Sequence, residues 1–167
     1  MIRLIGAVLL IFCGWVIGFG LANNQKKHLR QLELLDHYLE CLCSELEYTQ
    51  SPLHEIAYGL SRHPVFDDFG FAQMCAQAPK GQSFSSAFLK ATAENRYLFG
   101  EEVFACLESL SDQLGNFPVE NQASSIAVCR CRIQQIIRET REKTAQNVKL
   151  FRSMGLLGGA AAVIILW

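Results

Sequence analysis

Cysteine is the residue type in this chain with the most obvious chemical potential. Seven of the 167 residues are cysteines, namely Cys13, Cys41, Cys43, Cys75, Cys106, Cys129 and Cys131. The two close pairs, Cys41/Cys43 and Cys129/Cys131, have one intervening residue, which on a helix turns their side chains about 200° apart. That spacing is poor for zinc, and the four histidines form no ligand pattern beside the cysteines. We therefore predict no metal site, and the odd number of cysteines indicates free thiols.

Other catalytic patterns are missing from the sequence. There is no glycine-rich loop ending in Lys-Ser/Thr, no nucleophile elbow, no His-Glu-x-x-His and no dinucleotide fingerprint. The adjacent Asp67 and Asp68 are a poor acid–base pair, because neighbours on a helix do not face each other. A solvated surface is the better interpretation of these two acids. We predict a protein that is not an enzyme, has no catalytic residue and no cofactor, and binds no nucleic acid.

Residues 1–22 are predicted to form an N-terminal transmembrane helix. Residues 4–22 carry no charge, and as a helix they extend roughly 28 Å, close to the hydrocarbon thickness of a bilayer. A cleaved signal peptide is the alternative, because Gly20 and Ala22 resemble the small residues of a cleavage site. Against it, the apolar run is long and its basic cluster follows rather than precedes it. That cluster, Lys26, Lys27 and Arg30, places the rest of the chain in the cytoplasm.

Residues 153–167 are predicted to form a C-terminal transmembrane segment. They are uncharged but extend only about 22 Å as a helix, which is short for a span. The alternative is a helix buried in a soluble core, against which three consecutive alanines and the lack of a polar face argue. Basic residues again precede the segment, namely Lys143, Lys149 and Arg152. The positive-inside rule therefore predicts a membrane hairpin with both termini outside.

Residues 23–152 are predicted to form one cytoplasmic helical bundle domain. Apolar or semi-apolar residues recur three and four positions apart in residues 25–50, which predicts one long helix with a single packing seam. The seam positions are Leu32, Leu35, Leu39, Leu42, Leu46 and Thr49. A second long helix is predicted over residues 119–152, which contain neither glycine nor proline. The predicted fold is an all-α bundle on two long antiparallel helices that continue into the N- and C-terminal membrane segments.

Short helices are predicted between the two long ones. Ser51 is expected to be the N-cap and Pro52 the first residue of the helix that follows. Residues 65–76 are predicted to form another short helix, and Ser83 is expected to cap the next one. The inward residues of the 65–76 helix are predicted to be Phe66, Phe69 and Met74.

Charge is distributed unevenly along this chain of net charge −1. Residues 33–120 contain fourteen acids and four bases, whereas residues 130–152 contain seven bases and two acids. The bases therefore lie next to the predicted membrane segments, where anionic lipid favours them. A merely solvated helical surface is the simpler interpretation of any single one of these residues.

Small residues recur at intervals of four in both predicted membrane segments. Gly14 and Gly18 form one such pair, and Gly155 and Gly159 form the other. Stripes of this kind let two membrane helices approach closely, so these glycines are candidates for helix packing. The alternative is that glycine is simply common in membrane helices.

Four stretches of the chain resemble the stage III sporulation protein AB family. They are residues 2–10, Leu46–Ile56, Ser109–Gly115 and Phe151–Gly159, and the likeness covers nearly the whole length. The resemblance implies an endospore former and a protein in the mother-cell membrane that faces the engulfed forespore. It also implies a secretion-like channel and a domain similar to that of the platform protein F family of type II secretion and type IV pili.

The resemblance implies a platform subunit that engages a cytoplasmic secretion-type ATPase and other subunits of the same channel complex in the lipid bilayer. The acidic distal end of the bundle is our candidate docking face. Its candidate residues are Glu101, Glu102, Glu108 and Asp112. The alternative function is a membrane-tethered helical adaptor, or a sensor that binds a ligand or a redox signal through its thiols.

Overall fold

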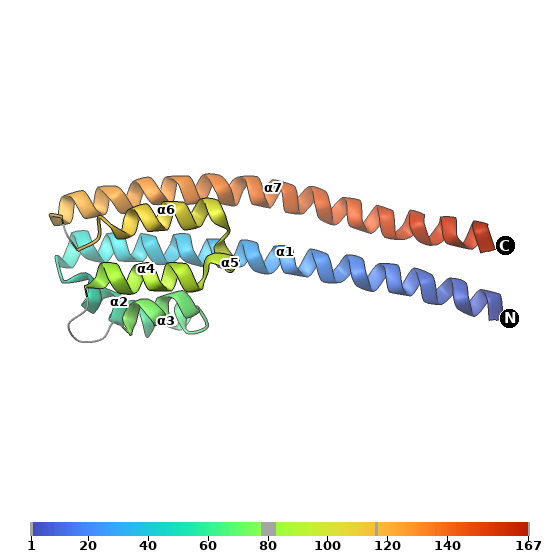
Figure 1. The fold of residues 1–167 in the computed structure, drawn as a ribbon, viewed down its shortest axis with the longest axis horizontal. Helices are drawn as coiled ribbons and strands as arrows, with labels where there is room; N and C mark the ends of the chain where they lie inside the picture. Colours follow the sequence, from blue (N-terminus) through green and yellow to red (C-terminus); the bar gives the residue numbers. More distant parts are fainter. Residues whose placement is uncertain (1, 78–82, 116, 167) are drawn as a thin grey trace. The chain divides into compact units, whose positions relative to one another are not determined.

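The computed structural model describes the backbone of residues 2–77, 83–115 and 117–166, and the side chains of residues 25–77, 83–115 and 117–145. Every regular element in the described backbone is helical, and no strand occurs in it. This confirms the predicted all-α class (Figure 1). The chain divides into two compact units, Arg30–Ile137 and Met1–Leu29 with Arg138–Trp167. The predicted domain boundaries at residues 22/23 and 152/153 stay predictions.

Two long helices contribute to both units. Helix α1 comprises Ile2–Thr49 and helix α7 comprises Val119–Leu166, with 48 residues each. Within Arg30–Ile137, Arg130 of α7 contacts Asp36 of α1, whereas Ala123 of α7 contacts Cys43. Residue numbers therefore rise along one helix as they fall along the other, so these segments of α1 and α7 lie side by side and antiparallel.

The predicted seam of α1 is buried over most of its length. Its five leucines, Leu32, Leu35, Leu39, Leu42 and Leu46, are at most 2% exposed. Thr49 is exposed instead, and its hydroxyl donates a 2.7 Å hydrogen bond to the carbonyl of Glu45. On α7, Ile126, Ile133 and Ile137 are buried.

An ion-pair cluster joins α1 to α7 beside this apolar seam. The guanidinium of Arg130 lies 3.1 Å from a carboxylate oxygen of Asp36 and 3.1 Å from one of Glu40. The side-chain amide of Gln134 also donates to Asp36, at 3.1 Å. The Arg130 side chain is 19% exposed, so these contacts fix the pairing of the two helices at a half-buried position.

Five short α-helices and one 3₁₀ helix connect α1 to α7. They are α2 (Leu53–Ser61), the 3₁₀ helix η1 (Pro64–Phe66), α3 (Gly70–Ala76), α4 (Phe84–Glu94), α5 (Arg96–Phe99) and α6 (Glu101–Ser111). Helix α2 packs on α3, α3 on α4, and α4 on α6. Ser83 caps α4 as predicted, because its hydroxyl accepts a 3.3 Å hydrogen bond from the amide of Ser86.

The predicted start of the helix after α1 is wrong, and so is the single helix predicted over residues 65–76. Helix α1 ends before Gln50, whose φ is +51°, and the N-cap of α2 is Pro52 rather than Ser51. The amide of Ser51 donates to the hydroxyl of Thr49 at 3.3 Å. Pro52 has an extended ψ of 137°, so the helix starts one residue later, at Leu53.

Residues 65–76 do not form one helix. Pro64 begins a 3₁₀ turn whose N-cap is the ring of His63, and Phe69 is extended before α3 starts at Gly70. Phe66 and Phe69 are both buried, as predicted, and the break changes which residues of α3 face the core. The buried residues of α3 are Phe71, Ala72 and Cys75, and Met74 is only half-buried.

Aromatic rings fill the centre of the Arg30–Ile137 unit. Tyr38 meets Phe66 and Phe71 edge to face, with ring centroids 5.6 and 5.8 Å apart. Phe71 in turn packs against Phe88 at 5.3 Å and Phe99 at 5.5 Å. Edge-to-face pairs of this kind add to the stabilisation from burial alone. The leucine seam and these rings together bury a face of α1 broader than the predicted single stripe.

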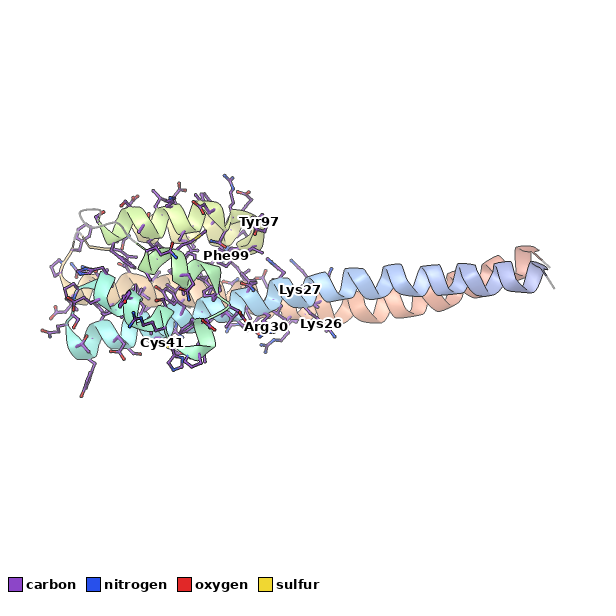
Figure 2. The ribbon with its side chains drawn as sticks, turned by 90° about the horizontal axis from the view of Figure 1, so that it is seen from below. Lys26, Lys27, Arg30, Cys41, Tyr97 and Phe99 are labelled. Carbon is purple, nitrogen blue, oxygen red and sulfur yellow. The ribbon has the colours of Figure 1, made fainter. Side chains whose placement is uncertain are left out.

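The unit of Met1–Leu29 and Arg138–Trp167 is basic where its side chains are described. Lys26 and Lys27 on α1 are exposed (Figure 2), as are Arg138, Arg141 and Lys143 on α7. Among the side chains that the structure describes, no helix has an apolar stretch long enough to cross a membrane. The predicted membrane segments lie outside those side chains, and so do Gly14, Gly18, Gly155 and Gly159. The two membrane segments and the packing role of their glycines stay predictions.

Candidate functional site

Helix α6 carries Glu101, Glu102 and Glu108 of the candidate docking face, and Asp112 is the residue that caps its carboxyl end. It begins after Gly100, whose φ of +82° and ψ of 165° suit glycine and few other residues. Val103, Leu107 and Leu110 turn inward and are buried, because residues three and four apart share one face of a helix. The acids Glu101, Glu102, Glu108 and Asp112 are all exposed.

Glu101 is held by an arginine of the preceding helix. Two nitrogens of Arg96 lie 2.9 and 2.6 Å from its two carboxylate oxygens. The Arg96 guanidinium also lies 4.5 Å from the centroid of the Phe104 ring. The hydrogen bond from Arg96, helped by its charge, lowers the pKa of Glu101. Because Arg96 compensates its charge locally, Glu101 is the weaker candidate for binding a basic partner.

Glu102 does not share a face with the other three acids. Residues seven and eleven positions apart lie on one helical stripe, which groups Glu101 with Glu108 and Asp112. Glu102 lies about 100° further round the helix, where its carboxylate is 3.6 Å from Arg132 of α7. The structure therefore divides the predicted set into a stripe of three acids and one acid that faces α7.

Glu108 and Asp112 occupy the end of α6 where carboxylates are least favourable. The carboxyl end of a helix carries partial negative charge, so acids there cost about 0.3–1 kcal/mol where bases would stabilise. The last turn of α6 contains no basic residue. The helix dipole therefore does not account for this pair of acids.

A groove runs between α6 and α7 on the face where Glu102 lies. Its volume is about 850 Å³. It is lined by Glu102, Ala105, Cys106, Ser109 and Leu110 of α6, by Gln113 in the turn after α6, and by Ser124, Ser125, Val128, Cys129 and Arg132 of α7. The Glu102–Arg132 pair bounds one end of this α6–α7 groove, and a hydrogen bond from Ser125 to Gln113 bounds the other.

Two cysteines meet in the wall of the α6–α7 groove. The sulfur atoms of Cys106 and Cys129 are 2.7 Å apart, although the residues are 23 positions apart in the sequence. The spacing argument from the sequence concerned only cysteines two positions apart and did not predict this pair. The contact between Cys106 and Cys129 depends on how α6 is aligned along α7, and helical periodicity in the sequence does not reveal that alignment. Among the described side chains, no three cysteines, histidines or acids gather as metal ligands.

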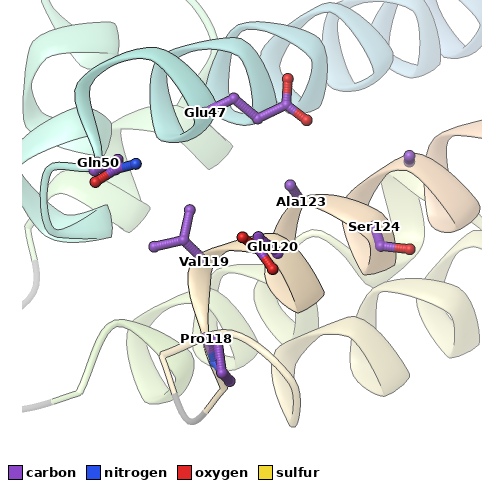
Figure 3. A pocket seen from close by; sticks show the side chains of 8 residues that line it. Glu47, Gln50, Pro118, Val119, Glu120, Ala123 and Ser124 are labelled. Carbon is purple, nitrogen blue, oxygen red and sulfur yellow. The ribbon is translucent and has the colours of Figure 1, made fainter.

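A second hollow lies between the end of α1 and the start of α7 (Figure 3). Its volume is about 650 Å³, and Glu47 of α1 and Glu120 of α7 are its charged lining residues. The other lining residues include Gln50, Val119 and Ser124. This hollow adds two carboxylates to the acidic surface of the Arg30–Ile137 unit and presents no nucleophile–base pair.

The family model described as Stage III sporulation protein AB matches residues 3–167. The chain belongs to the stage III sporulation protein AB family. Stage III sporulation protein AB of Bacillus subtilis (strain 168) is 25% identical over 173 residues, which cover 99% of this chain and 99% of the relative. No solved structure matches the chain. The family assignment confirms the resemblance and supports a role in sporulation, and the family name gives no sign of enzymatic activity.

Proposed function

We propose that this chain is a non-enzymatic, membrane-anchored assembly subunit of a sporulation-specific, secretion-like channel between mother cell and forespore. The observation that carries the proposal is the end-to-end family match over residues 3–167. That match includes nearly all of both predicted membrane segments, and the Bacillus subtilis relative is covered over 99% of its length. The match therefore supports treating the two predicted anchors and the helical domain as one unit.

Membrane attachment is supported by the charges next to the predicted segments. Lys26 and Lys27 follow residues 1–22, and Arg138, Arg141 and Lys143 precede residues 153–167; all five are exposed. Bases in such positions favour the cytoplasmic side and anionic headgroups. In this proposal the helical bundle faces the mother-cell cytoplasm from the membrane around the forespore.

The proposed partners are a cytoplasmic secretion-type ATPase and other subunits of the same channel complex. The stripe on α6 supplies the surface, with Glu108 and Asp112 as its principal charges. Acids placed where they do not stabilise their own helix suit binding to a complementary basic surface, because such charges guide encounter and fix register. The chain contributes position and contact to the complex rather than chemistry.

The test is complementation of a deletion strain in the spore-forming host of this chain. The double variant Glu108→Lys/Asp112→Lys is expected to reduce heat-resistant spores and to weaken capture of the ATPase at least about tenfold, equal to ~1.4 kcal/mol. The matched control is Asp67→Lys/Asp68→Lys, which reverses two exposed acids outside α6. The control is expected to behave as wild type.

Stability separates a docking defect from misfolding in this test. Replacing acids by lysines at the carboxyl end of α6 is expected to leave the protein as stable as wild type, or more stable by about 0.3–1 kcal/mol for each site. A double variant that folds, reaches the membrane, sporulates and captures the ATPase like wild type would exclude this docking face. A deletion strain that sporulates normally would exclude the proposed function itself.

A further inference from the structure

Cys106 and Cys129 are placed for covalent chemistry with each other. Their sulfurs are 2.7 Å apart, and the Cys106 thiol also lies 3.7 Å from the carbonyl oxygen of Cys129. A disulfide bond measures about 2.05 Å, so the two sulfurs need to approach by only about 0.7 Å. Cys106 is half-buried and Cys129 is 4% exposed. One thiol is therefore accessible and the other is sheltered behind it.

The α6–α7 groove gives small molecules a route to this pair. Cys106 and Cys129 both line the groove, and Ser109 and Ser125 add hydroxyl groups to its walls. The groove's charged groups are Glu102 and Arg132, which pair with each other at one end. A small polar oxidant can thus reach Cys106 without any rearrangement of the buried core.

We propose that Cys106 and Cys129 form a redox-active dithiol site that a small peroxide oxidises to a disulfide. The inference is independent of the docking function proposed above. In the first step the Cys106 thiolate attacks a peroxide oxygen, an S–O bond forms as the O–O bond breaks, and hydroxide leaves and takes up the thiol proton as water, so that Cys106 becomes a sulfenic acid. In the second step Cys129 attacks the Cys106 sulfur, the S–S bond forms and water leaves. With hydrogen peroxide, two thiols and one peroxide give one disulfide and two waters.

Exposure assigns these two roles, because Cys106 is half-buried in the groove wall and Cys129 is 4% exposed. The electrostatics agree: the hydrogen bond between Cys106 and Cys129, with a smaller contribution from the charge of Arg132, lowers the pKa of Cys106. The hydrogen bond with Cys106 and burial raise the pKa of Cys129. The thiolate is the nucleophilic form of cysteine, so Cys106 attacks first and Cys129 resolves the sulfenic acid.

The disulfide changes how α6 is held. In the reduced protein the groove side of α6 contacts α7 through the Glu102–Arg132 pair and the Gln113–Ser125 hydrogen bond. A bond between Cys106 and Cys129 adds a covalent link between these contacts and closes a loop between residues 23 positions apart. Oxidation therefore adds a covalent link between α6 and α7, and reduction leaves only the noncovalent contacts.

The test uses the purified, fully reduced, full-length chain with one equivalent of hydrogen peroxide and peptide mapping by mass spectrometry. We expect one intramolecular disulfide between Cys106 and Cys129, formed at least about tenfold faster than oxidation of the exposed Cys131. Dithiothreitol is expected to restore all thiols. A product that links other cysteines, or equal rates at Cys106 and Cys131, would overturn the proposal.

Matched variants assign the order of attack. Cys129→Ala is expected to accumulate a sulfenic acid at Cys106, which a cyclic 1,3-dione probe traps, whereas Cys106→Ala is expected to leave Cys129 unoxidised. Cys131→Ala is the control and is expected to form the disulfide at the wild-type rate. Sulfenic acid at Cys129 in the Cys106→Ala variant would reverse the assigned roles. Mapping of the wild-type product decides the proposal even if a variant folds poorly.

Discussion

Tyr38 is the residue on which the aromatic core of the Arg30–Ile137 unit converges. Its ring is fully buried, and burial raises the pKa of its hydroxyl. No described group makes a hydrogen bond of ordinary geometry to that hydroxyl, whose polar neighbour is the weakly bonding Cys75 thiol. The ring therefore provides the stabilisation at this position, and the hydroxyl contributes little.

We expect Tyr38→Phe to change the free energy of unfolding by less than about 1 kcal/mol. Phe71→Ala, which empties the neighbouring ring site, is expected to lower it by about 3–5 kcal/mol. Urea denaturation of the purified full-length variants measures both changes. A Tyr38→Phe loss as large as that of Phe71→Ala would mean that the hydroxyl makes an essential hydrogen bond.

Sequence reasoning located part of this core. The leucines of α1 follow a regular seven-residue spacing, so their burial was predictable from periodicity. Tyr38 lies off that seam, and Phe71 belongs to a helix that the sequence analysis began several residues too early. Both residues are buried by tertiary packing, which a local repeat does not encode.

At the scale of the elements, two glycines lie in different backbone conformations. Gly100 separates α5 from α6 with a φ of +82°, whereas Gly59 lies inside α2. A Cβ atom added at either position meets no neighbouring atom within 4 Å. Backbone conformation alone therefore decides the effect of a side chain at each site.

We expect Gly100→Ala to lower the free energy of unfolding by roughly 1–3 kcal/mol, because alanine is strained in that conformation. Gly59→Ala is expected to raise it by about 0.4–1 kcal/mol, because alanine favours the helix and restricts the unfolded chain. The same denaturation experiment measures both variants. Equal effects at the two sites would contradict the conformational explanation.

The candidate site was predictable as a cluster of charge but not in its contacts. Counting charges placed Glu101, Glu102, Glu108 and Asp112 together at the acidic distal end of the bundle. Their ion pairs with Arg96 and Arg132, which divide the set further, depend on residues that approach from other elements. The Cys106–Cys129 contact was out of reach for the same reason, because it depends on how α6 packs against α7.

At the scale of the whole molecule, the helical bundle lies in the sequence between two predicted membrane segments. The family match covers the chain from residue 3 to residue 167, a range that includes nearly all of both terminal segments. Hydropathy and flanking charge predicted those segments, and the described side chains lie between them, from residue 25 to residue 145. The side of the membrane on which the bundle lies decides which partners it can bind.

Topology is the most direct test of this central claim. A reporter active only outside the cytoplasm is fused after Trp167 and, separately, inserted within residues 78–81. We predict an active terminal fusion and a silent internal insertion. Together these results would establish a membrane hairpin whose bundle lies in the cytoplasm. An active internal reporter would place the bundle outside the cytoplasm and contradict a platform that engages a cytoplasmic ATPase.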